Sequence, residues 1–117
     1  MDKRIKMMTE YIPDNWVVLK LTYKDEISHK VLCGWSGGYL DGDSWRLNSG
    51  ITHVEDHETH YSFYSYSGSV YKVWKYSYGL RMYTADVYNR WKEKFGDAIE
   101  TMSEDTDWMN LEWTNNG

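Results

Sequence analysis

The sequence predicts an α+β fold: a twisted antiparallel sheet of about five to seven strands with one main α-helix packed on one face. Three observations predict it: several short segments alternate apolar and polar residues, glycine or serine turns separate them, and one later segment has helical spacing. The chain has 117 residues, the usual size of a single domain, so residues 1–117 are expected to form one domain. Residues 1–13 are polar and end in Pro13, which predicts a loose N-terminal arm.

The first expected strand pair consists of NWVVLKLTY and SHKVLCGW, joined by the polar turn KDE. Val17, Leu19 and Leu21 fall on one face of the first segment. Trp16 and Val18 fall on the opposite face, because successive side chains of a strand alternate. Both segments are rich in β-branched or aromatic residues and lie close together in the chain, which predicts an antiparallel pair.

The middle of the chain predicts further short strands. SWRLNSG and ITHVEDH are either two strands separated by Gly50 or one bent strand with a bulge there. HYSFYSYSG places Tyr61 and Phe63 on one side and Tyr64 on the other. The turn at 67–69, Ser-Gly-Ser, then returns the chain as VYKVWKYSY, which predicts a hairpin.

The main helix is expected over about Ala85–Phe95, with Thr84 as its N-cap and Gly96 at its C-terminal end. Its apolar stripe consists of Val87, Trp91 and Phe95. These residues are spaced four apart, so they share the face that packs on the sheet.

After the helix, AIETM is expected to form a short strand and WMNLEW a strand or short helix. Trp108 and Trp113 lie near the chain end and need an apolar partner. We interpret them as a contact with a second copy of the chain, which predicts a homo-oligomer.

Composition and charge exclude several classes of function. The net charge of −5 argues against binding a nucleic-acid polymer, since such proteins present a basic face. The single cysteine, Cys33, cannot form an internal disulfide and is typical of a reducing compartment. The start of the chain lacks the apolar segment of a signal peptide, and no apolar run reaches the roughly 18 residues of a membrane span. We expect an intracellular protein with no membrane partner.

Metal binding and catalysis find weak support in the sequence. The run HVEDHETH puts His53, Glu55 and His57 on one side of a strand, but a polar strand end explains it equally well. LDGDSWRL is no EF-hand loop, because Arg46 stands where that loop requires glycine. Cys33 ends an apolar strand, where a buried and inert thiol is usual. We therefore predict no catalytic residue, no metal and no cofactor.

The glycine-rich stretch CGWSGGYLDGDSWRLNSG, residues 33–50, is the strongest candidate for a binding element. It matches neither a dinucleotide-binding nor a P-loop fingerprint. Its glycine amides could form an anion nest, its aromatic rings could stack on a base, and Arg46 could pair with a phosphate. The polar side chains would contact hydroxyls or the base. The predicted ligand-binding residues are Trp35, Ser36, Gly37, Gly38, Tyr39, Asp41, Asp43, Trp45, Arg46 and Asn48.

Two interpretations of this stretch stay open. It is either a structural corner that packs tryptophans against the sheet or a binding nest with stacking walls. If SWRL is a strand, alternation sends Trp45 and Arg46 to opposite faces, so the ten residues cannot all converge.

Several segments resemble a family of small, mostly uncharacterised proteins encoded by tailed bacteriophages, including marine T-even-like phages. They are NWVVLKL, KVLCGWSGGYLDGDSWRLNSGI, SGSVYKV, YGLRMYTADVYNRW and EDTDWM, and they cover roughly residues 15–109. The resemblance implies no catalytic residues. It implies a setting in the host cytoplasm, where small accessory phage proteins often counter host defence and some sequester nucleotide immune signals.

Together, the resemblance and the glycine-rich stretch predict a phage protein that binds a small nucleotide signal without cleaving it. A cyclic ADP-ribose isomer or a cyclic dinucleotide would be such a signal. Two alternatives stay open. One is an acidic protein that blocks a host defence protein through its exposed aromatic surface. The other is a hydrolase of the signal.

Overall fold

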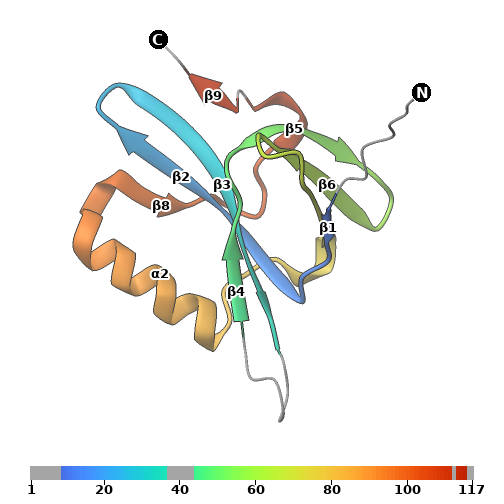
Figure 1. The fold of residues 1–117 in the computed structure, drawn as a ribbon, viewed down its shortest axis with the longest axis horizontal. Coiled ribbons are helices and arrows are strands. Elements are labelled where there is room, and N and C mark those ends of the chain that lie inside the picture. The colour runs from blue at the N-terminus through green and yellow to red at the C-terminus, as the bar shows by residue number, and fades with distance from the viewer. Residues whose placement is uncertain (1–8, 37–43, 112, 116–117) are drawn as a thin grey trace.

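The computed structural model describes residues 9–36, 44–111 and 113–115, and it confirms the α+β class with one main helix packed against a sheet (Figure 1). The elements in chain order are β1 (Glu10–Tyr11), β2 (Asn15–Tyr23), β3 (Glu26–Trp35), β4 (Ser44–Leu47), β5 (Ile51–Asp56), β6 (His60–Ser65), β7 (Val70–Trp74), the 3-10 helix η1 (Lys75–Ser77), α2 (Met82–Phe95), the 3-10 helix η2 (Gly96–Ala98), β8 (Ile99–Thr101), the 3-10 helix η3 (Trp108–Asn110) and β9 (Thr114–Asn115). Among these described elements, no helix is both long and apolar enough to cross a membrane.

The strands divide between two sheets, which the sequence did not predict. One sheet has the order β1-β7-β6-β5, and its short first strand runs parallel to β7. The other has the order β4-β3-β2-β8, with β9 pairing with β3. β2 and β3 form the predicted antiparallel pair, in register from Asn15–Gly34 to Tyr23–Glu26.

The second sheet is covered on both faces, and this explains the nearly continuous apolar run at the start of β2. Trp16 and Val18 lie in the core between the two sheets. Val17 and Leu19 lie in a second core, where Tyr88 and Trp91 of α2 pack against the opposite face. The alternation predicted for this strand is therefore confirmed.

Gly50 lies where the chain passes from one sheet to the other. β4 belongs to the sheet of β2 and β3, whereas β5 belongs to the other sheet, so the alternative of one bent strand is wrong. Gly50 has a φ of +134°, a conformation that side chains disfavour. A Cβ atom there would also lie 3.0 Å from Cδ2 of Tyr66. Glycine is thus required at this crossover.

Helix α2 begins at Met82, three residues before the predicted start. Arg81 is the N-cap, and Thr84 lies inside the first turn, where its hydroxyl accepts the Arg81 N–H at 2.9 Å. The prediction that Thr84 is the N-cap residue is therefore wrong. Thr84 is the third residue of the helix, and its hydroxyl accepts the backbone N–H of the N-cap residue, Arg81. Gly96 ends the helix as predicted, with a φ of +59°. Phe95 is 53% exposed, so the buried stripe ends before it.

Two expectations about the chain ends need correction. The predicted N-terminal arm is not loose throughout, because Glu10–Tyr11 pairs with β7 and Pro13 is fully buried. Trp108 and Trp113 are buried in the core between the sheets, where both pack against Phe63. The chain itself supplies the apolar partner that they need. Because both tryptophans are buried, they give no reason to expect a homo-oligomer, which stays a prediction.

Candidate functional site

Three side chains from different parts of the chain gather around Arg46, and we call the four residues the Arg46 cluster: Tyr11, Trp35, Arg46 and Tyr71. Arg46 in β4 is the register partner of Cys33 in β3. It therefore projects to the same face of the sheet as Trp35, two residues further along β3. Tyr11 and Tyr71 reach this place from β1 and β7, which are themselves paired at these two residues.

The contacts within the Arg46 cluster fix the guanidinium group. Its central carbon lies 4.4 Å from the centroid of the Tyr11 ring, in a cation–π contact. Its Nε–H donates to the hydroxyl of Tyr71 at 3.1 Å. Tyr11 stacks on Tyr71 at 4.9 Å between centroids and meets the edge of Trp35 at 6.3 Å. The indole N–H of Trp35 donates to the Ile12 carbonyl at 2.9 Å.

The electrostatics of the cluster leave a positive charge at the surface. The hydrogen bond to Tyr71 raises the pKa of Arg46, which therefore stays charged at every physiological pH. Burial raises the pKa of Tyr71, so its hydroxyl keeps its proton. Among the described residues, no carboxylate lies within ion-pair distance of Arg46, and its two terminal nitrogens have no hydrogen-bond partner. These nitrogens can take an anion in a bidentate manner.

Trp45 does not share a site with Arg46. It is the register partner of Gly34, so it projects to the opposite face of the sheet. There its ring meets that of Trp91 in α2 edge to face, at 5.3 Å between centroids. Because SWRL is a strand, the alternation expected for it does send Trp45 and Arg46 to opposite faces, so the two residues cannot contact one ligand at this place.

The side chain of Asn48 is used by the fold, whereas that of Ser36 is exposed. Asn48 is 2% exposed, and its side-chain oxygen accepts the Val31 N–H at 2.9 Å. Its burial disfavours contact with a ligand's hydroxyls, and its ligand-binding role stays a prediction. Its amide nitrogen has no hydrogen-bond partner among the described residues. The backbone N–H of Ser36 donates to Asp14 at 2.7 Å, and Ser36 is exposed beside Trp35.

The remaining predicted ligand residues, Gly37, Gly38, Tyr39, Asp41 and Asp43, lie outside the residues that the structure describes. Their roles stay predictions. The segment 37–43 connects β3 to β4, whose ends are paired at Trp35 and Ser44. Trp35 and Ser44, the last paired residues on either side of this segment, thus lie at the Arg46 cluster.

Cys33 lies next to the cluster but is a poor nucleophile. Burial raises the pKa of its thiol to about 12. The reactive form of cysteine is the thiolate, which is scarce at neutral pH when the pKa is so high. The Sγ–H instead donates to the Arg46 carbonyl at 3.5 Å.

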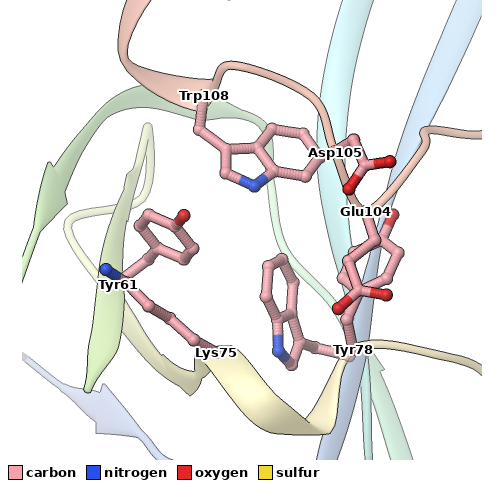
Figure 2. A pocket seen from close by; sticks show the side chains of 7 residues that line it. Tyr61, Lys75, Tyr78, Glu104, Asp105 and Trp108 are labelled. Carbon is pink, nitrogen blue, oxygen red and sulfur yellow. The ribbon is translucent and has the colours of Figure 1, made fainter. Parts of the chain in front are cut away.

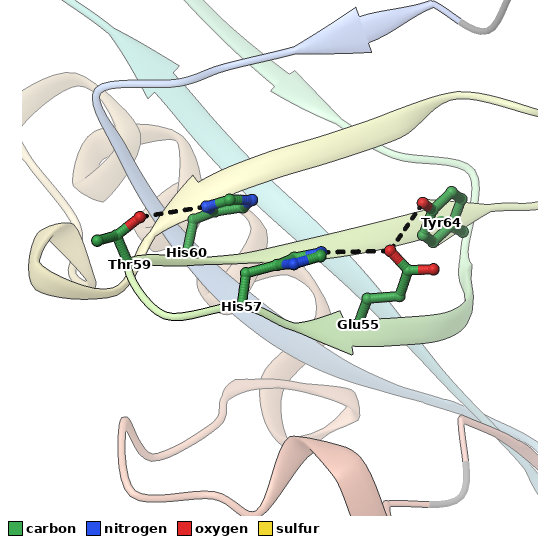
Figure 3. A network of polar contacts seen from close by, with 5 residues as sticks. All are labelled: Glu55, His57, Thr59, His60 and Tyr64. Atoms are coloured by element: carbon green, nitrogen blue, oxygen red, sulfur yellow. Dashed lines mark hydrogen bonds and ion pairs between the residues drawn. The ribbon is translucent and has the colours of Figure 1, made fainter.

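The histidine run lies on the outer sheet face, in pairs rather than around one point (Figure 3). His57 contacts Glu55 at 3.3 Å and stacks on His60 at 4.6 Å between centroids. His53 stacks on Tyr64 instead, at 4.3 Å. Within the part of the chain that the structure describes, no group of three or more His, Cys, Asp or Glu side chains is placed to hold a metal ion.

Two features of the structure could not be predicted from the sequence. Tyr11 and Tyr71 complete the Arg46 cluster, although no local pattern joins them to Arg46. A cavity of about 190 Å³ also opens among Trp16, Tyr61 and Trp108 (Figure 2). The aromatic share of 17% was the one signal for such a cavity, and it does not identify which rings form the wall.

No protein-family model, curated protein or solved structure matches this chain. The resemblance to the phage family therefore stays a prediction.

Proposed function

We propose that this protein binds and sequesters a small nucleotide-derived signal without cleaving it. Arg46 would hold a phosphate of the signal, and Trp35 would offer a ring for stacking. In the setting that the phage resemblance implies, such a protein would act in the host cytoplasm as an anti-defence protein.

The position of the Arg46 guanidinium group supports this proposal most strongly. An arginine that is free in solution loses about 1.5–2 kcal/mol of rotamer entropy when it is immobilised. The contacts with Tyr11 and Tyr71 have already imposed much of that cost during folding. A pre-positioned guanidinium whose two terminal nitrogens have no hydrogen-bond partner among the described residues binds a phosphate more tightly than a mobile one would.

A nucleotide suits this place better than a simple inorganic anion, because Trp35 lies beside the charge. Trp35 is half-buried, and its N–H is bound to the Ile12 carbonyl, so the ring is held in place. Stacking of a base on an aromatic ring contributes about 1–3 kcal/mol. The high pKa of the Cys33 thiol supports the non-catalytic part of the proposal.

Calorimetric titration with cyclic ADP-ribose and cyclic di-GMP tests the proposal. We expect saturable binding of at least one of them, and the ligand should be recovered intact after the complex is heated. Arg46→Lys should weaken binding about tenfold, because lysine keeps the charge but loses the bidentate geometry. Arg90→Lys is the matched control, since Arg90 is an exposed helix arginine paired with Asp86 at 3.5 Å. Cleaved ligand, or equal effects of the two substitutions, would contradict the proposal.

A second candidate function is the blocking of a host protein. Tyr76 and Met82 favour it, because they are 82% and 90% exposed although large and apolar. If neither nucleotide binds, the double variant Tyr76→Ser/Met82→Ser should abolish the anti-defence effect in infected cells.

A further inference from the structure

We infer that residues 9–12 form a strap that opens and closes as one unit over the Arg46 cluster, and that a bound nucleotide holds the strap closed. The inference rests on the proposed function, because its ligand is the nucleotide that Arg46 and Trp35 are proposed to contact. The strap consists of β1 and the residue on either side of it, Thr9 and Ile12. It lies at the edge of the sheet that contains β5, β6 and β7 (Figure 1).

The strap holds both of the side chains that are proposed to touch the ligand. The ring of Tyr11 makes the cation–π contact with Arg46, whose central guanidinium carbon lies 4.4 Å from the ring centroid. The backbone carbonyl of Ile12 accepts the indole N–H of Trp35 at 2.9 Å. Arg46 belongs to β4 and Trp35 to β3, so both lose a contact when the strap leaves them. Opening of the strap therefore loosens two groups of the binding site at once.

Few contacts attach the strap to its sheet. β1 is two residues long and pairs with β7 in parallel, whereas the other pairings that the structure describes between named strands are antiparallel. Parallel pairing is slightly less stable per residue. The Thr9 carbonyl accepts the Val70 N–H at 2.9 Å, and Thr9, Glu10 and Ile12 are exposed. Exposed segments with few contacts open locally, at a much lower free-energy cost than unfolding of the domain.

The chain is firmly fixed directly after the strap. Pro13 is fully buried, and its ring restricts the backbone φ angle. The N–H of Asp14 donates to the Gly34 carbonyl at 2.9 Å, and the Asp14 carboxylate accepts the Ser36 N–H at 2.7 Å. Strand β2 begins at the next residue. Opening therefore pivots between Ile12 and Pro13, and the residues of the strap move together.

Ligand binding and closure of the strap are coupled through the two side chains that they share. A nucleotide that contacts Arg46 and Trp35 binds the closed form more tightly, because both side chains are already oriented there. By linkage, the bound nucleotide shifts the strap towards the closed form by the same factor. Such coupling is typically about 5- to 150-fold. We expect about tenfold, because Arg46 keeps its hydrogen bond to Tyr71 when the strap opens.

Hydrogen exchange of the full chain, measured by NMR, tests whether the strap opens as one unit. The reporters are the Val70 N–H and the indole N–H of Trp35, which donate to the two ends of the strap from different sheets. Glu10→Gly should speed the exchange of both protons about threefold, because glycine weakens a strand. Glu100→Gly makes the same change in the short edge strand β8 and is the matched control, which should alter neither proton. If Glu10→Gly speeds the exchange of only one proton, or of neither, the inference is wrong.

The same two protons test the coupling to the ligand. At saturation, whichever of cyclic ADP-ribose and cyclic di-GMP binds in calorimetry should slow the exchange of both protons about tenfold. The His57 N–H donates to the His60 carbonyl at 2.9 Å at the tip of the β5–β6 hairpin, and its exchange should stay unchanged. A nucleotide that binds without slowing the two reporter protons would overturn the inference and leave the proposed function standing. Failure of both nucleotides to bind would overturn the proposed function and the coupling together.

Two substitutions of Tyr11 test the role of its ring. Tyr11→Phe keeps the ring that contacts Arg46 and should retain the tenfold protection by the nucleotide. Tyr11→Leu removes the ring and should reduce this protection to about threefold or less. Tyr23→Leu is the matched control, because it removes a cation–π contact with Lys24 at 5.5 Å at the opposite end of β2. If Tyr11→Leu keeps the full protection, as the control should, the strap is not coupled to the ligand.

Discussion

Removal of one hydroxyl, in Tyr71→Phe, should weaken nucleotide binding without unfolding the protein. The Tyr71 ring is buried in the core and stays in place, while Arg46 loses the acceptor for its Nε–H at 3.1 Å. A hydrogen bond to a charged group contributes about 1.5–3 kcal/mol to stability. Because Arg46 is exposed to solvent, the contribution of its bond to Tyr71 should lie near or below the lower end of that range. We expect the free energy of unfolding to fall by about 1 kcal/mol, or about 4 °C in Tm.

The effect on binding should be of about the same size as this stability loss. Without the Tyr71 hydroxyl, the Arg46 side chain regains rotamers that a ligand must then restrict, at a cost of up to about 2 kcal/mol. Affinity for the nucleotide that binds should fall about three- to tenfold in calorimetry. Tyr64→Phe is the matched control, because Tyr64 also loses a side-chain hydrogen bond, to Glu55 at 3.1 Å, in the same sheet. A folded Tyr71→Phe protein with the affinity of the control would refute the claim that Tyr71 pre-positions Arg46.

Two further predictions concern stability. Burial lowers the pKa of His29 below its ordinary value of 6.5, and its Nδ1 contacts the Trp113 carbonyl at 3.0 Å. Just below pH 6.5, the unfolded chain therefore binds more protons than the folded chain does. Chemical denaturation should show stability falling as the pH drops from 7 to 5; His29→Gln should flatten this dependence and His53→Gln should not. Gly34→Ala should cost about 2–3 kcal/mol, because its Cβ would lie 2.7 Å from Cγ2 of Thr84. Thr84→Ser removes that methyl group, so the double variant Gly34→Ala/Thr84→Ser should recover most of the stability lost in Gly34→Ala. If the stability losses of the two single variants simply add in the double variant, this clash is not the cause.

The features that sequence analysis predicted correctly are those set by neighbouring residues. Alternation along β2 assigned Val17 and Val18 to opposite faces, and both faces proved to be buried. The hairpin of β6 and β7 and the end of α2 at Gly96 also follow from local chemistry. The division into two sheets does not, because it depends on the crossover at Gly50 and on which strands then pair.

The candidate site shows the same limit. The sequence singled out Trp35 and Arg46, and the structure brings them to one face. It could not supply Tyr11, which comes from a segment expected to be loose and reaches Arg46 through pairing with β7. The cavity likewise draws its wall from residues as far apart as Trp16 and Trp108, which no spacing in the sequence connects.

The most direct test of the central claim is an NMR titration that follows the side-chain Nε–Hε signal of Arg46, assigned by its loss in Arg46→Lys. The central claim is that a pre-positioned Arg46 holds the phosphate of a nucleotide. Added cyclic ADP-ribose or cyclic di-GMP should shift this signal saturably while the signals of Arg81 and Arg90 stay in place. A nucleotide that binds and leaves the Arg46 signal unmoved would contradict the account, as would the failure of both nucleotides to bind.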